Sequence, residues 1–91
     1  IKPNMVLSNE PGCYKENEFG IRIENLVYVS KNKNNIRFKN FTLAPIDIDL
    51  INFKMLNSDE KKYLFSYHMD IYTKISKYLS FKEKKWLLSL I

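Results

Sequence analysis

The sequence has almost no cysteine and no long apolar run. Its one cysteine, Cys13, excludes an internal disulfide framework and a multi-cysteine zinc site. Nothing therefore indicates an oxidising compartment, and we expect a cytoplasmic protein. No stretch approaches the roughly 20 apolar residues that cross a bilayer, and there is no basic-then-apolar leader, so we expect no membrane partner.

The sequence also has no dense basic stripe. Its formal net charge is +5, but the lysines are spread along the chain, with a modest cluster at Lys82, Lys84 and Lys85. Nucleic-acid sites usually gather basic residues on one face with aromatic residues between them. We therefore expect no nucleic-acid partner, and a salt-dependent shift with DNA or RNA would test that hypothesis.

Apolar residues are plentiful. They make up 45% of the 91 residues, with 27% charged, which is typical of a packed body rather than a disordered tail. A chain of this length forms at most one small domain and is marginally stable without help. It begins at Ile1, and the next residues lead directly into a strand pattern, so we expect a fragment of a larger protein.

The first half of the chain has the pattern of β-strands. The runs Met5–Asn9 and Phe19–Val29 predict two strands of a hairpin. The polar run Ser30–Asn35 predicts a surface loop or the tip of a second hairpin, which leads into Ile36–Leu43. After that, the alternating residues of Pro45–Phe53 predict an extended, half-buried arm.

The second half changes to a helical period. Asn57 with Glu60 and Ser80 with Glu83 are capping-box pairs, so each predicts the start of a helix. Apolar residues at spacings of three and four mark one face of the first helix: Leu64, Tyr67, Ile71, Ile75, Tyr78 and Leu79. The last helix carries Trp86, Leu87, Leu90 and Ile91, which we expect to be covered by another part of the protein or by a partner.

Two glutamates face each other if the first hairpin is centred on Asn17. Paired positions then sum to 34, which places Glu10 opposite Glu24 with their Cβ atoms about 4.5–5.5 Å apart. Their repulsion is relieved by protonation of one carboxylate, by a cation such as Arg22 on the same face, or by a metal ion. The alternative is that both glutamates are ordinary solvated strand residues.

Longer segments resemble a known family. MVLSNEPGCY, followed by FGIRIENLV, resembles the last two metal-binding motifs of aminopeptidase P, a pita-bread metallopeptidase. FKNFTLAPIDIDLI, then YH and WL further on, resembles the C-terminal region of the longer enzymes of this family. The resemblance implies an α+β fold: antiparallel hairpins that complete a pita-bread catalytic domain over residues 1–35, then an extended arm and two helices over residues 36–91.

The resemblance also implies a metal centre. The family holds two divalent ions, commonly Mn²⁺, with two aspartates, one histidine and two glutamates. By this match Glu10 binds one ion and Glu24 bridges both, while Arg22 supports them and Tyr14 lies near the site. The other ligands belong upstream of Ile1, and His68 does not match the ligand histidine.

The function that the resemblance implies is that of a Xaa-Pro aminopeptidase. Such an enzyme hydrolyses the peptide bond before a penultimate proline, with Glu10 as a candidate to accept the proton of the attacking water. We expect a homodimer in the full-length protein, and no activity from the 91 residues alone, because two carboxylates do not fix a dinuclear centre. The alternative is an inactive interaction module, or a split or degraded gene product.

Two residues have competing interpretations. Cys13 stands where the family usually has an aromatic residue, and we interpret it as a small packing residue, because no histidine or aspartate is placed to activate the thiol. His68 is either a pH-sensitive contact or a structural histidine with its hydrogen bonds satisfied, and we favour the structural interpretation.

Overall fold

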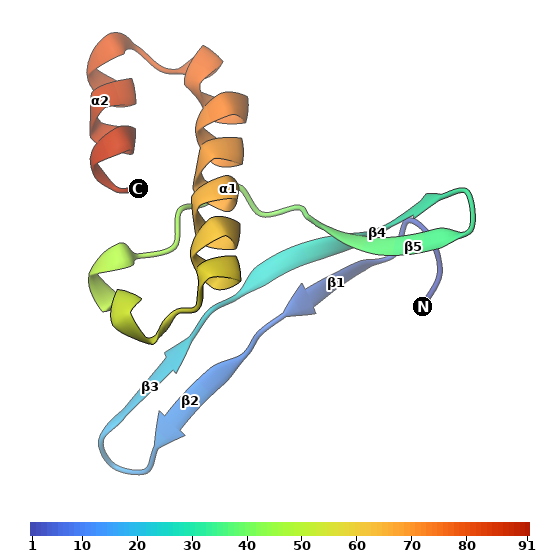
Figure 1. Cartoon of the computed structure of the whole chain (residues 1–91), viewed down its shortest axis with the longest axis horizontal. Coiled ribbons are helices and arrows are strands. Elements are labelled where there is room, and N and C mark those ends of the chain that lie inside the picture. Colours follow the sequence, from blue (N-terminus) through green and yellow to red (C-terminus); the bar gives the residue numbers. More distant parts are fainter. The chain divides into compact units, whose positions relative to one another are not determined.

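The computed structural model describes residues 1–91 as two compact units (Figure 1). The first unit is Ile1–Thr42 and contains all the strands, whereas the second is Leu43–Ile91 and contains all the helices. No helix is both long enough and apolar enough to cross a membrane.

The first unit is built around one long antiparallel ribbon (Figure 1). Its strands are β1 (Val6–Asn9), β2 (Gly12–Lys15), β3 (Phe19–Arg22) and β4 (Asn25–Asn32). β1 pairs with β4 and β2 pairs with β3, and every paired position in both ladders sums to 34. This confirms the predicted register.

The loop at the far end of the ribbon is centred on Asn17. This residue has a φ of 59°, in the left-handed region that asparagine adopts more readily than most residues. The N–H of Glu18 donates to the carbonyl of Lys15 at 3.1 Å and closes the turn. The predicted single strand Phe19–Val29 is wrong, because the ladder is interrupted between β3 and β4.

A second hairpin adds β5 (Asn35–Asn40) to the other edge of β4, which gives the strand order β1-β4-β5. The polar run is thus a hairpin tip rather than a long loop, with only residues 33 and 34 between the strands. Val29 is fully buried and Val27 nearly so. The strand ends at Asn40, short of the predicted Leu43.

The second unit begins with the segment that we predicted as an extended arm, and that prediction is partly wrong. Two short 3₁₀ helices, η1 (Ile48–Leu50) and η2 (Phe53–Met55), interrupt it. Asp47 accepts a hydrogen bond from the N–H of Asp49, and Asn52 accepts one from Lys54. These local side-chain contacts favour turns, which alternation of apolar and polar residues does not reveal.

Helix α1 (Ser58–Ile75) begins as predicted, with Asn57 and Glu60 forming a complete capping box. Its buried residues are Leu64, Tyr67, His68 and Ile71. A 3₁₀ turn, η3 (Ser76–Tyr78), follows, and Tyr78 is exposed rather than on the packed face, because the helical period ends before it.

Helix α2 (Phe81–Ser89) also begins at a complete capping box, formed by Ser80 and Glu83. Leu87 is its buried residue. Phe81 and Trp86 are 78% and 61% exposed, so most of the apolar surface of this helix is uncovered in the chain.

Candidate metal centre

Glu10 and Glu24 lie where the long ribbon is interrupted. Glu10 stands between β1 and β2, and Glu24 stands between β3 and β4. Pro11 has no N–H to donate, which weakens the ladder at this point. The carbonyl of Pro11 still accepts from the N–H of Ile23 at 3.0 Å, so the register continues across the gap and the two glutamates stay opposed.

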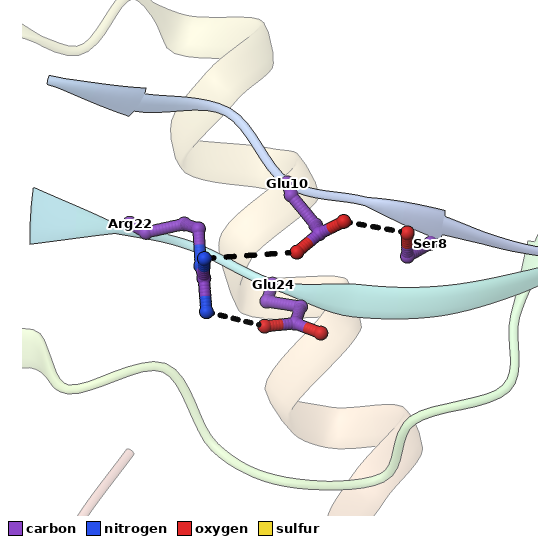
Figure 2. Close-up of polar contacts among 4 residues, drawn as sticks. All are labelled: Ser8, Glu10, Arg22 and Glu24. Atoms are coloured by element: carbon purple, nitrogen blue, oxygen red, sulfur yellow. Dashed lines mark hydrogen bonds and ion pairs between the residues drawn. The ribbon is translucent and has the colours of Figure 1, made fainter.

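Arg22 joins the two carboxylates (Figure 2). Its Nη2 lies 3.0 Å from Oε2 of Glu24, and its Nη1 lies 3.8 Å from Oε1 of Glu10. The three side chains are 41–51% exposed, so solvent screens these charges and their effect on folding is modest. The sequence predicted that a cation, a proton or a metal relieves the repulsion, and Arg22 lies within ion-pair distance of both carboxylates.

Ser8 is a fourth member of the group, which sequence reasoning missed. Its hydroxyl donates to Oε2 of Glu10 at 2.7 Å (Figure 2). The available signal was position: Ser8 precedes Glu10 by two residues, and residues two apart in an extended strand share a face.

Tyr14 lies flat along the ribbon beside this group. A Cβ atom on Gly12 would come within 2.6 Å of its hydroxyl oxygen, and one on Gly20 within 2.6 Å of its ring. Both glycines therefore leave the space that the ring occupies. Because Gly12 pairs with Arg22, this places the tyrosine next to the arginine along the ribbon; that it lies near a metal site stays a prediction.

Strand β4, which begins directly after Glu24, is anchored at Leu26. The N–H of Leu26 donates to Oγ1 of Thr42 at 2.8 Å, and the carbonyl of Leu26 accepts from the N–H of Phe41 at 2.8 Å. Thr42 thus extends the hydrogen bonding of β4 beyond the end of β5. Sequence reasoning did not find this contact, because the two residues lie 16 positions apart.

His68 and Cys13 do not belong to the group formed by Ser8, Glu10, Arg22 and Glu24. His68 is buried in the second unit, where its Nε2 accepts from the N–H of Ile46 at 3.1 Å, and burial lowers its pKa below 6.5. The hydrogen bond and the burial fit the structural interpretation, and the lowered pKa adds a pH dependence to that structural role. Cys13 is exposed on β2 opposite Ile21, so it does not pack as we expected.

The pair has the chemistry of a partial metal site. Carboxylate oxygen is the donor that hard divalent cations such as Mn²⁺ and Mg²⁺ prefer, and two carboxylates with one guanidinium leave a net charge of −1. No group of three or more histidine, cysteine, aspartate or glutamate side chains gathers in the chain. Glu10 and Glu24 therefore fit part of a metal-binding set rather than a whole one.

Comparisons with known proteins agree with this arrangement. Residues 34–90 match the model described as the C-terminal region of peptidase_M24, and residues 1–31 match that of metallopeptidase family M24. An uncharacterized peptidase of Schizosaccharomyces pombe is 42% identical over 96% of this chain and 16% of its own length. A probable Xaa-Pro aminopeptidase P of Pyrenophora teres f. teres is 41% identical over 80% of this chain and 12% of its own length.

A solved structure matches nearly the whole chain. It is an X-prolyl aminopeptidase from Caenorhabditis elegans, described as a cytosolic enzyme with a di-nuclear active site. The match has a TM-score of 0.86 at 28% identity and covers 99% of this chain and 16% of that one. The chain therefore spans only 12–16% of the length of these relatives.

The opposed glutamates on an antiparallel ribbon, followed by two capped helices, define the C-terminal part of a pita-bread metallopeptidase with an α+β fold. The chain belongs to metallopeptidase family M24, and it is the model of that family's C-terminal region that covers more than half of it, residues 34–90.

Proposed function

We propose that this chain supplies two metal ligands to a Xaa-Pro aminopeptidase, which removes the first residue from peptides with proline at the second position. The observation that carries the proposal is the juxtaposition of Glu10 and Glu24 on one guanidinium, in a chain of this family. The names of the relatives support the substrate class.

Glu10 and Glu24 are the residues that would hold the ions. Glu10 would bind one, and Glu24 would bridge two, because a carboxylate has an oxygen for each. A pair of divalent ions, when bound, supplies a nucleophilic water at neutral pH and stabilises negative charge on the peptide carbonyl. Two carboxylates provide at most four oxygen donors, so further ligands would come from outside these 91 residues. We propose Mn²⁺ as the metal.

The remaining side chains of the group would position these ligands. Arg22 would hold the glutamates in their relative orientation, and Tyr14 would lie at the edge of the site. Glu10, which the ribbon leaves 41% exposed, would accept a proton from the attacking water.

We also propose how the chain is organised and where it acts. Residues 1–35 would complete the catalytic domain and residues 36–91 would form the appended region. The full-length protein, meaning the polypeptide that carries this chain with the remaining ligands, would be a cytoplasmic homodimer. Its C. elegans relative is described as cytosolic, which supports the compartment.

Hydrolysis of an Ala-Pro-containing peptide by the full-length protein tests this function. We expect activity that a chelator abolishes and Mn²⁺ restores, and a fall of about 100-fold or more in Glu10→Gln and Glu24→Gln. Glu16→Gln, in the β2–β3 loop, is the matched control and should retain activity. An inactive interaction module would instead show no metal-dependent hydrolysis by any form.

A further inference from the structure

Ser8 gives Glu10 a neutral hydrogen-bond donor. The Oγ–Oε2 distance of 2.7 Å is close to that expected for a hydroxyl that donates to a carboxylate. Ser8 lies on β1 and pairs with Leu26, the residue that Thr42 anchors from the other side of β4. The backbone of Ser8 is therefore held by regular strand pairing rather than lying in a loop.

The carboxylate of Glu10 is restrained through both of its oxygens. Ser8 binds Oε2, while Arg22 lies 3.8 Å from Oε1 (Figure 2). Without such partners the terminal torsion of a glutamate is broad, and a side chain that is 41% exposed samples many orientations. A ligand that is already oriented loses less conformational freedom when it binds a cation.

The two restraints differ in charge. Arg22 carries a positive charge, which opposes a cation at the same carboxylate, whereas a serine hydroxyl adds none. A carboxylate has about four acceptor positions, and Ser8 uses one of them on Oε2. Because Ser8 uses only that position, the hydroxyl orients the ligand without competing for Oε1, the oxygen that Arg22 faces at 3.8 Å.

We propose that Ser8 is a positioning residue that orients Glu10 for metal binding. The inference rests on the proposed function, because it concerns the same site. Partners that orient a metal ligand in this way typically change metal affinity by about 10–100-fold when they are removed.

The test compares Mn²⁺ affinity in the full-length protein and its Ser8→Ala and Ser8→Thr variants, measured by the electron paramagnetic resonance signal of free Mn²⁺. Ser8→Ala should weaken binding about 10–100-fold, and Ser8→Thr, which keeps the hydroxyl, should bind within a few-fold of the unsubstituted protein. At saturating Mn²⁺, Ser8→Ala should recover most of its kcat. Ser30→Ala, a serine of β4 in the same sheet, is the matched control and should leave the affinity unchanged.

Three other outcomes would overturn the inference, and they show whether the proposed function fails with it. Unchanged Mn²⁺ affinity in Ser8→Ala would show that the hydroxyl does not orient the ligand, and would leave the proposed function standing. Equal loss in Ser8→Ala and Ser8→Thr would assign Ser8 a packing role instead. If the unsubstituted protein binds no Mn²⁺, the proposed function fails, and the inference fails with it.

Discussion

Arg22 is the residue on which the charge balance of the ribbon depends. It contacts two carboxylates that the strand register brings face to face, at 3.0 Å and 3.8 Å. In exposed positions such pairs contribute on the order of 0.2–1 kcal/mol to folding, so their main effect is on the orientation of the side chains.

Replacement of Arg22 should therefore affect metal binding more than stability. In the full-length protein, Arg22→Met should lower Mn²⁺ affinity about 10–100-fold, because we expect the lost orientation of the glutamates to outweigh the removal of a positive charge that opposes the ion. The Mn²⁺ affinity of Arg22→Lys should lie between those of Arg22→Met and the unsubstituted protein. Lysine keeps the charge but lacks the planar fork that contacts both carboxylates. Calorimetric titration with Mn²⁺ measures the effect, and unchanged affinity in Arg22→Met would contradict this role.

Tyr67 and His68 are neighbours on helix α1 that both form hydrogen bonds with the backbone of residues 44–46. The hydroxyl of Tyr67 donates to the carbonyl of Ala44 at 2.6 Å, and Nε2 of His68 accepts from the N–H of Ile46. Because Nε2 accepts this bond, it carries no proton in the folded chain. Together these contacts attach the segment before η1 to helix α1.

His68 should make stability depend on pH. Burial lowers its pKa below 6.5, so the unfolded chain binds the proton more strongly than the folded chain. This contribution is complete above about pH 6.5 and is lost as the pH falls below that value toward the folded pKa. Urea unfolding of the chain at pH 7.5 and 5.5 should show a decrease in stability at the lower pH.

Two variants isolate that effect from the titration of carboxylates. His68→Gln keeps an acceptor but does not titrate, so its decrease between the two pH values should be smaller than that of the unsubstituted chain. Tyr67→Phe removes the hydrogen bond to the carbonyl of Ala44, so its free energy of unfolding should fall by about 1 kcal/mol at both pH values. An equal pH dependence in His68→Gln would rule out this role for the histidine.

At the scale of elements, the sequence predicted the parts that depend on local chemistry. The capping boxes at Asn57 and Ser80 were found because both partners lie within four residues of each other. The register of the first hairpin was found because its turn lies at Asn17 and its pairing is symmetric about it.

The sequence did not predict the elements in which local side-chain contacts compete with strand pairing for the same backbone groups. The run Phe19–Val29 is continuous by composition, yet the ladder is interrupted at residues 23 and 24, and Pro11 lies opposite Ile23. Pro45–Phe53 alternates as a strand does, yet the side chains of Asp47 and Asn52 cap 3₁₀ turns instead. Alternation reports which faces are apolar, but not whether a partner strand is present.

The cap of helix α1 is the element whose contribution is most easily measured. Asn57 accepts from the N–H of Glu60 at 2.8 Å, and Glu60 accepts from the N–H of Asn57 at 2.9 Å. Asn57→Ala should destabilise the chain by about 1 kcal/mol in urea unfolding, whereas Asn57→Asp, which keeps an acceptor oxygen, should cost little. Equal stability of all three forms would show that packing alone fixes the start of the helix.

At the scale of the whole molecule, the chain corresponds to a small part of its relatives. It spans 12–16% of the length of its relatives, and its two candidate ligands are joined by no third. The sequence predicted the register that opposes the two glutamates and the position of Arg22 beside them, and their role as ligands stays a prediction. Any further ligands of the proposed site could not be predicted from these 91 residues, because a metal site draws its donors from segments distant in sequence.

The exposed apolar residues of α2 indicate a surface that another part of the protein or a partner covers. Trp86 is the only tryptophan, and it is 61% exposed in the chain. We expect the rest of the protein or a partner to cover it, because exposed apolar patches mark interaction surfaces. Its fluorescence should then shift to shorter wavelength in the full-length protein relative to the chain alone, and identical spectra would contradict this expectation.

Metal stoichiometry tests most directly whether Glu10 and Glu24 are ligands of a dinuclear site. The full-length protein should bind two Mn²⁺ ions that are magnetically coupled in electron paramagnetic resonance, and Glu24→Gln should lose the coupled signal, because its side chain would bridge the ions. The 91-residue chain alone should bind neither ion tightly. Two coupled ions in Glu24→Gln, or tight binding of two ions by the chain alone, would contradict the account.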